Sequence, residues 1–311
     1  MSTPTRVAGF VVALAAAFAL AVGVGNVFGS DAEPQGAAHD THDADEPDTA
    51  QQASADAADI PGGLMTSQDG YTLALTEPSA AAGDDVPVTF TITGPDGEAV
   101  TTYDVEHEKQ LHLIAVRRDL TGFQHVHPEL SPDGTWATDL DLTGGQWRLF
   151  ADFQASGADA LTLGADLAVA GDYQPAEHAG DSRSAQVDGY TVTLDGDLSA
   201  GTDAKLTLSV ERNGRPVTDL EPYLDAYGHL VALRAGDLAY LHVHPDGTPD
   251  DGTTEPGPDV VFYAAVPSAG TYHLYLDFKH QGVVRTAAFT VTGAGTSGSA
   301  PADAGDAHTG H

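Results

Sequence analysis

The chain contains no cysteine and only two methionines, Met1 and Met65. The lack of cysteine excludes disulfides, thiolate nucleophiles and thiolate metal ligands. The scarcity of methionine excludes a methionine-rich copper(I) site. Any transition metal held by this chain must therefore be bound through nitrogen and oxygen atoms, which suits copper(II) or zinc.

Basic residues are also scarce, since 12 Lys and Arg stand against 46 Asp and Glu and give a formal net charge of −34. A surface this acidic repels nucleic acids and anionic lipids, so we expect no nucleic-acid partner. Metal cations are its natural companions, but the same composition also serves as a solubility device. The charge by itself does not decide between these two explanations.

A histidine pattern occurs twice in the sequence. His112 stands 13 residues before an HVHP tetrad at 125–128, and His229 stands 13 residues before an identical tetrad at 242–245. The surrounding strings EKQLHLIAVRRDLTGFQHVHP and DAYGHLVALRAGDLAYLHVHP align without a gap. The chain is therefore an internal duplication, and its best-kept feature is imidazole, a common ligand of transition metals.

The sequence between the termini favours β-strands. Segments such as VPVTFTITG, WRLFADF and KLTLSVE are short, rich in β-branched and aromatic residues, and separated by turn sequences such as GPDG and RNGR. No long window carries the apolar spacing of a helix. We predict an all-β fold with two tandem immunoglobulin-like or cupredoxin-like antiparallel β-sandwich domains, which follow an N-terminal hydrophobic helix.

The predicted segments are a leader, a disordered acidic spacer, a first β-sandwich, a linker, a second β-sandwich and a disordered tail. They cover residues 1–29, 30–62, 63–171, 172–185, 186–293 and 294–311. The leader has 22 uncharged residues at 7–28 and is either a signal anchor or a signal peptide; its length favours the anchor. Both interpretations place the rest of the chain outside the cytoplasm, anchored to the cell membrane or secreted.

The histidines of the first copy are expected to share one face of a hairpin. If LHLIAV and FQHVHP pair through an even-numbered loop, then His112, His125 and His127 all point the same way. Opposed residues of such a hairpin lie close enough for two rings to reach one ion. In the second copy, a tight turn at Ala235-Gly236 would put His229 opposite His242, with His244 beside them.

Carboxylates repeat as well. Asp152 in WRLFADFQ matches Asp277 in YHLYLDFKH, and each lies within an apolar strand, where a carboxylate must be paired, hydrogen-bonded or bound to metal. Glu108 and Asp225 also match, four residues before the first histidine of each copy. Pro128 and Pro245 are expected to end strand pairing after the tetrads, at a sandwich edge.

We therefore predict one metal site in each domain. The predicted ligands are His112, His125, His127 and Asp152 in the first copy and His229, His242, His244 and Asp277 in the second. The alternative is structural, with the rings hydrogen-bonded to backbone carbonyls or stacked on aromatic residues. The other histidines of the body, at 107, 178, 273 and 280, are assigned to the surface or to packing. Those of the terminal segments, at 39, 42, 308 and 311, either capture metal weakly or are merely solvated.

Catalytic motifs are not convincing. The string HEKQLH at 107–112 is one residue too long for HExxH, and GAGTSG at 293–298 is not followed by a helical pattern. No GxSxG elbow, P-loop or EF-hand sequence is present. We predict no enzymatic activity, with a metal-dependent hydrolase as the alternative left open.

The two histidine-bearing strings resemble a family of exported or membrane-anchored bacterial proteins with tandem β-domains, often labelled secreted or heavy-metal-associated. The resemblance covers both copies and is most specific around 112–128 and 223–245. It implies a tandem β-sandwich outside the cytoplasm and a part in copper or other heavy-metal handling. It brings no ligand set of its own.

Two hypotheses of different kinds follow. The first is that the protein binds and buffers a divalent transition metal, copper(II) or zinc, outside the cytoplasm. The second is a non-catalytic immunoglobulin-like interaction module that docks a membrane or cell-envelope protein, with structural histidines. Metal bound in fixed stoichiometry without turnover separates the first from the second, and turnover would indicate the enzyme.

Overall fold

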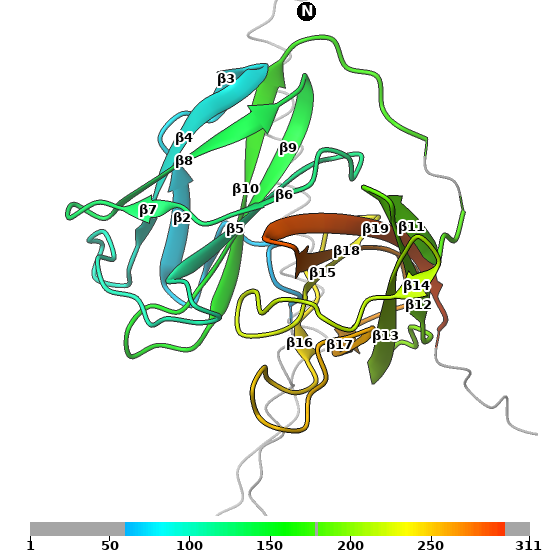
Figure 1. Ribbon diagram of the computed structural model, residues 1–311. Helices are drawn as coiled ribbons and strands as arrows, with labels where there is room; N and C mark the ends of the chain where they lie inside the picture. The colour runs from blue at the N-terminus through cyan, green and yellow to red at the C-terminus, as the bar shows by residue number, and fades with distance from the viewer. Residues whose placement is uncertain (1–59, 178–179, 296–311) are drawn as a thin grey trace, which may run out of the picture. The chain divides into compact units, whose positions relative to one another are not determined.

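The computed structural model describes residues 60–177 and 180–295, which contain 19 β-strands and no helix (Figure 1). The all-β prediction is therefore confirmed for this part of the chain. The predicted leader, nearly all of the predicted spacer and most of the predicted tail lie outside the described residues. In the described ranges, no helix is long and apolar enough to cross a membrane.

The first β-domain is a sandwich of two five-stranded sheets, with strand orders β1-β2-β4-β8-β7 and β3-β10-β9-β5-β6 (Figure 1). Nearly all neighbouring strands are antiparallel, and only β3 and β10 run parallel. Its strands are β1 (Ser67–Gln68), β2 (Tyr71–Leu75), β3 (Ser79–Ala81), β4 (Gly83–Thr93), β5 (Leu111–Arg117), β6 (Gln124–Val126), β7 (Glu129–Leu130), β8 (Thr135–Leu142), β9 (Gly145–Phe153) and β10 (Leu161–Ala170).

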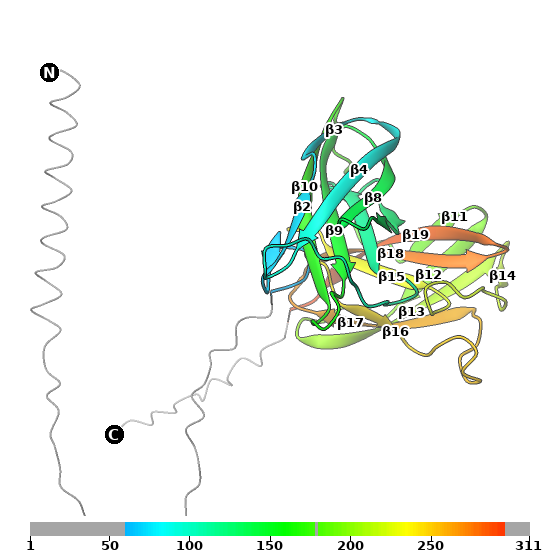
Figure 2. The ribbon, with the colours of Figure 1, turned by 90° about the vertical axis from the view of Figure 1, so that its left-hand side faces the viewer.

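The second β-domain repeats this plan with the sheets β11-β12-β13-β17-β16 and β15-β18-β19, while β14 pairs with β13. Its strands are β11 (Ser184–Val187), β12 (Tyr190–Asp195), β13 (Thr202–Arg212), β14 (Arg215–Pro216), β15 (His229–Arg234), β16 (Val243–Pro245), β17 (Asp259–Val266), β18 (Gly270–His280) and β19 (Val283–Gly293). Figure 2 shows its sheets edge on, with β18 and β19 in one layer and β17 in the other. Two tandem immunoglobulin-like sandwiches are thus present, as expected from the repeat.

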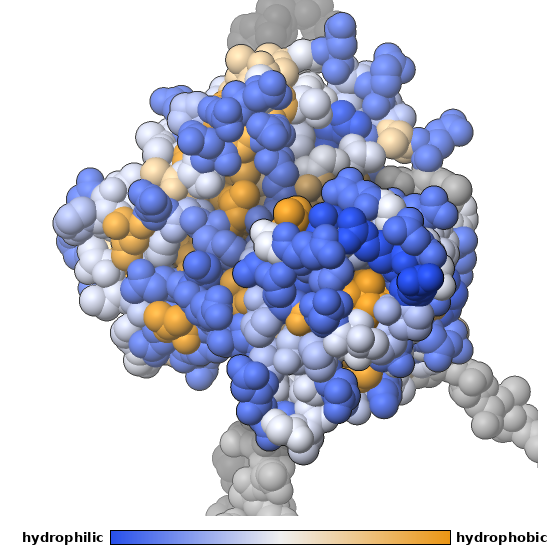
Figure 3. Space-filling view, in the orientation of Figure 1, coloured by the Kyte–Doolittle hydropathy of each residue, from blue (hydrophilic) through white to orange (hydrophobic). Residues whose placement is uncertain are grey.

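Each sandwich has its own core because alternate residues of its strands point inward. Phe90, Trp136 and Leu149 are among the buried residues of the first core, and Leu206, Phe262 and Phe289 are among those of the second. The face shown in Figure 3 is largely hydrophilic, with apolar side chains in small separate patches. The strongly acidic composition is therefore compatible with two ordinary apolar interiors.

A third apolar cluster joins the two domains. All six residues of β5 from Leu111 to Val116 are buried, since Leu113 and Ala115 face their own core while Ile114 and Val116 face the second domain. We call this cluster the interdomain core; its buried members are Ile114, Val116, Leu120, Phe150, Val231, Leu233, Leu238 and Tyr275. The two sheets that carry the histidines are consequently covered on both faces.

Aromatic residues at matching positions of the two copies pack on each other in and around the interdomain core. Phe123 stacks on Tyr275 with ring centroids 4.0 Å apart, and Tyr240 contacts Phe150 at 5.7 Å. Phe123 matches Tyr240 in the aligned copies, and Phe150 matches Tyr275. Each copy therefore offers the same two positions to the other, and this packing brings the histidine-bearing strands of both domains together.

The segment before β1 also connects the domains. Gly63 N–H donates to the Thr162 carbonyl of the first domain at 2.8 Å, and Tyr240 N–H of the second donates to the Gly62 carbonyl at 2.9 Å. Gly63 has a φ of 71°, and a Cβ there would lie 2.3 Å from the ring of Phe150. Only glycine fits so close to the interdomain core without a shift of that ring.

Candidate metal centre

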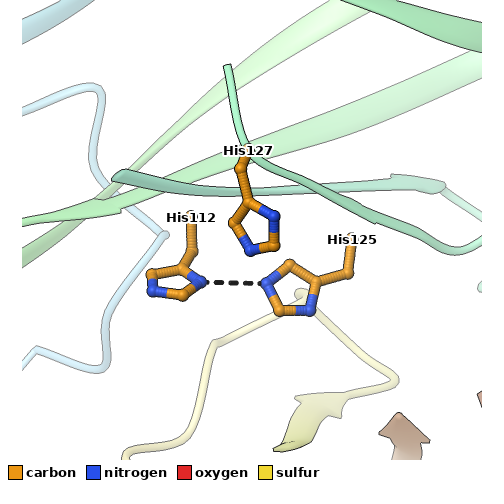
Figure 4. Close-up of side chains that lie close together, drawn as sticks. All are labelled: His112, His125 and His127. Atoms are coloured by element: carbon orange, nitrogen blue, oxygen red, sulfur yellow. Dashed lines mark hydrogen bonds between the residues drawn. The ribbon is translucent and has the colours of Figure 1, made fainter. Parts of the chain in front are cut away.

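The three histidines of the first copy lie together on one face of the sheet. His112 is in β5, His125 is in β6, and His127 follows β6 directly (Figure 4). Leu113 pairs with Val126 and Ile114 with His125, a pairing that puts the three rings on one face, as the sequence predicts for this hairpin. One nitrogen from each of the three rings lies within 4.8 Å of the others. The predicted clustering of these imidazoles is thus confirmed.

The second domain adds two groups to this cluster. His229 begins β15 and pairs in register with Asp277 of β18. Asp277 Oδ2 lies 2.8 Å from His125 Nδ1, and the His229 ring centroid lies 4.6 Å from that of His125. His125, His229 and Asp277 form a second group whose candidate ligand atoms lie within 4.8 Å of one another. We call His112, His125, His127, His229 and Asp277 together the histidine cluster.

The second tetrad does not join His229, contrary to the sequence prediction. Leu233 pairs with Tyr240, whereas the predicted register would place Leu233 opposite Leu238. Strand β16 then pairs with β17 in the other sheet, where His244 lies opposite Tyr263. His242 and His244 are exposed, and the His244 ring stacks on Tyr263 with centroids 5.7 Å apart. Pro245 is the last residue of β16, so the strand ends with the tetrad at a sheet edge, as expected.

The two matching aspartates occupy different surroundings. Asp277 contacts His125 of the other domain and accepts a hydrogen bond from Thr286 Oγ1 at 2.5 Å. Asp152 pairs in register with His112 and accepts a hydrogen bond from Thr162 Oγ1 at 2.9 Å. Burial raises the pKa of Asp152, while the nearby His242 and His107 lower it by a smaller amount. Among the described residues, Asp152 belongs to neither group of candidate ligands.

The other candidate residues lie outside the cluster or at its rim. Glu108 and Asp225 are exposed in matching two-residue turns with φ of 66° and 61°. His107, which the sequence assigns to the surface or to packing, lies at the rim, with its ring 6.2 Å from those of His112 and His229. His280 is buried in the second domain, between the Tyr190 hydroxyl and Asp219. The only signal for His107 in the sequence is its position five residues before His112.

Burial favours the neutral form of the His112, His127 and His229 imidazoles. It lowers the pKa of His112 to about 4 and that of His127 to about 3, and it lowers the pKa of His229 as well. The neighbouring rings of the cluster lower these pKa values further, because one protonated ring disfavours another. A neutral imidazole is the form that binds a metal ion. The cluster is therefore prepared for coordination near neutral pH.

The hydrogen bonds of His112 and His125 leave the contact between His125 and Asp277 without a proton when both rings are neutral. His112 Nε2–H donates to the Glu106 carbonyl at 3.1 Å, so the other nitrogen of this neutral ring must accept. His125 Nε2–H accordingly donates to His112 Nδ1 at 3.0 Å, as drawn in Figure 4. If His125 is neutral, its Nδ1 then faces the Asp277 carboxylate with no hydrogen between them. The contact requires a further proton or a bound cation.

Within the described residues, two buried ring nitrogens have no hydrogen-bond partner, namely His127 Nε2 and His229 Nδ1. An unsatisfied buried polar atom costs about 1–3 kcal/mol. A pocket of about 180 Å³ beside the cluster is lined by residues of both domains, including His107, Asp152, His229 and His242. Free nitrogens, a carboxylate and an adjacent pocket are the features that a bound zinc or copper(II) ion requires.

Comparisons with solved structures find remote likeness to adhesins and to a membrane anchored protein. The Escherichia coli adhesin FdeC is 21% identical, with a TM-score of 0.25, and the match covers 73% of this chain and 65% of that one. The Yersinia pseudotuberculosis adhesin InvE is 13% identical, with a TM-score of 0.22 and coverages of 72% and 58%. A putative membrane anchored protein of Corynebacterium diphtheriae is 12% identical, with a TM-score of 0.22 and coverages of 73% and 60%. The chain thus spans less than two thirds of each of these proteins, and a likeness this low says nothing about function.

A search of curated proteins finds no match. A family model described as a domain of unknown function, DUF8832, matches residues 66–170 and again residues 185–295. The two matches cover more than half of the chain and fall on the two β-domains. The chain therefore belongs to the DUF8832 family and carries two copies of its domain.

Proposed function

We propose that the protein binds a divalent transition metal, zinc or copper(II), at the histidine cluster between its two β-domains. The main support is that His127 Nε2 and His229 Nδ1 are buried without hydrogen-bond partners. The other donor groups of the cluster, His112, His125 and Asp277, lie close to these two residues. Metal bound at the cluster would give these buried nitrogens a partner and would also neutralise the Asp277 carboxylate. This site differs from the sequence prediction of one separate site in each domain.

The proposed role is to buffer, sequester or deliver the metal outside the cytoplasm. Location follows from the expected leader at 1–29, and the choice of metals follows from the absence of cysteine. The pocket beside the cluster gives the metal a route from solvent, past His107 and His242. Catalysis is not part of this proposal.

The test compares His127 with His244, which occupy the same place in the two tetrads. The background protein is the full-length chain in which the five histidines outside the described residues are replaced: His39→Ala, His42→Ala, His178→Ala, His308→Ala and His311→Ala. Zinc and copper(II) binding would be measured by isothermal titration calorimetry. We expect His127→Ala to weaken binding by more than about tenfold, or 1.4 kcal/mol, and His244→Ala to leave it unchanged. Equal effects, or no binding by the folded background protein, would contradict the proposal.

A second candidate is an interaction module with structural histidines. It is favoured by the bonds that already join the domains, since His125 contacts Asp277 and the Tyr275 hydroxyl donates to the Leu120 carbonyl at 2.7 Å. In that case the histidine cluster would only fix the angle between the two sandwiches for a membrane or cell-envelope partner. His127→Ala would then lower stability without any metal effect, which the same titration distinguishes.

A further inference from the structure

We infer that the histidine cluster holds two metal ions and that the imidazole of His125 bridges them. This inference rests on the proposed metal-binding function and specifies the form of its site. One ion would be bound by His112, His125 and His127, and the other by His125, His229 and Asp277.

The two groups of candidate ligands share a single residue, His125. Its two ring nitrogens face different groups, because Nε2 lies 3.0 Å from His112 Nδ1 and Nδ1 lies 2.8 Å from Asp277 Oδ2. A tetrahedral zinc ion with Zn–N bonds of about 2.0 Å holds its ligand atoms about 3.3 Å apart. Both contacts of His125 are therefore near the spacing that a shared metal needs, and they use opposite sides of the ring.

Each group also contains a histidine with an unsatisfied nitrogen. His127, whose Nε2 has no partner, belongs to the first group, and His229, whose Nδ1 has none, belongs to the second. A single ion bound by the first group would leave His229 Nδ1 buried and unpartnered, and an ion bound only by the second would do the same to His127. Two ions satisfy both nitrogens, which one ion in either group does not.

The chemistry of the bridge balances without a redox step. A neutral His125 carries one N–H proton, which must leave when both nitrogens bind metal. That proton passes to water, and the ring becomes an imidazolate with one negative charge. Together with the Asp277 carboxylate, the imidazolate offsets part of the charge of two divalent ions.

The groups are chemically unequal. The first offers three nitrogens, and the second offers two nitrogens and one carboxylate oxygen. Three-nitrogen sets and sets of two histidines with one carboxylate both suit zinc, and imidazole also suits copper(II). The two ions can therefore be copper(II) in both places, which makes the bridge directly observable by magnetic resonance.

The experiment is a copper(II) titration of the background protein, followed by electron paramagnetic resonance. We expect two equivalents to bind, with the integrated signal at two equivalents falling close to zero because the imidazolate couples the two spins. Only one bound equivalent, or two equivalents with the full signal of two isolated ions, would overturn the bridge while leaving the proposed function standing. No binding by the folded protein would overturn both.

Two variants locate the bridge. His229→Ala removes a ligand of the second group only, so we expect one equivalent and the undiminished signal of an isolated ion. His125→Gln removes the shared ring and should abolish the loss of signal, even where copper still binds. His242→Ala, a histidine at the pocket but in neither group, is the matched control and should keep two coupled ions. Circular dichroism verifies that each variant folds, and loss of coupling in the folded His242→Ala variant would count against the assignment.

Discussion

Asp277 in β18 of the second domain lies 2.8 Å from His125 Nδ1 in β6 of the first, although 152 residues separate them in sequence. The two side chains are only 4% and 2% exposed. A buried carboxylate beside an imidazole fixes the orientation of the ring and raises its basicity toward a metal. This single contact therefore links the association of the domains to the properties of the candidate site.

The first prediction concerns the two matching aspartates. Asp277→Asn removes the charge that faces His125, so we expect metal affinity to fall by about 10–100-fold. Asp152→Asn, in which the bond to Thr162 can be kept, should change the affinity by less than about threefold, or 0.7 kcal/mol. Calorimetric titration of both variants with zinc gives the comparison. Similar losses of zinc affinity in the two variants would show that the contact between Asp277 and His125 contributes no more to binding than Asp152 does.

The second prediction concerns pH. A histidine of the unfolded chain has a pKa near 6.5, whereas burial lowers the pKa of His112 in the folded protein to about 4. Between these values the unfolded chain binds more protons, so the metal-free protein should lose stability as the pH falls from about 6.5 to about 4. His112 alone accounts for on the order of 3 kcal/mol at the end of this range.

Urea unfolding in the presence of a chelator, at several pH values, measures this slope. Asp152 acts in the opposite direction, because burial raises its pKa and protonation then favours the folded state. The variant His112→Phe isolates the histidine contribution and should show a shallower decline toward acid pH. Equal slopes in the parent and the variant would refute the assignment.

Much of the fold could be predicted from the sequence. The alternation within segments such as VPVTFTITG, the turn sequences and the repeat predicted two β-sandwiches, and the described residues contain them. The contact between the domains was not predicted, although LHLIAV and HLVALR carry a signal for it. A strand with one solvent-exposed face alternates apolar and polar residues, whereas these two segments carry consecutive apolar residues. Continuous apolar strands in an antiparallel sheet indicate a second packed layer.

The candidate site was likewise predicted only in part. The face shared by His112, His125 and His127 follows from the period of a strand and was predicted correctly. The second copy differs because the chain leaves β15 after Leu241 and its next strand, β16, pairs with β17. This long-range pairing is not recorded in any local sequence pattern. His229 and Asp277 could not be assigned to the first cluster before the association of the domains was known.

The third prediction tests the interdomain core. Phe150 and Phe153 both lie in β9, but Phe150 belongs to the interdomain core and Phe153 to the core of the first domain. Replacing either by alanine should cost about 3–5 kcal/mol. Only Phe150→Ala should separate the unfolding of the two domains into two calorimetric transitions, because it weakens their contact. A single transition in Phe150→Ala, or splitting in Phe153→Ala as well, would contradict the role of this layer.

The last prediction joins the core to the metal. A ligand that binds only the folded state stabilises it by about 2.7 kcal/mol at one hundred times its Kd. Because the histidine cluster takes His112, His125 and His127 from one domain and His229 and Asp277 from the other, a metal ion shared between them should also hold the domains together. Zinc should therefore restore a single calorimetric transition in Phe150→Ala. In the double variant Phe150→Ala with His229→Ala, zinc can still occupy the first group. It should therefore raise the transition temperature of the first domain and leave the transition temperature of the second domain unchanged. If zinc raises both transition temperatures equally in the double variant, the metal is bound elsewhere. If two separate transitions remain in Phe150→Ala with zinc, the two domains do not share the metal.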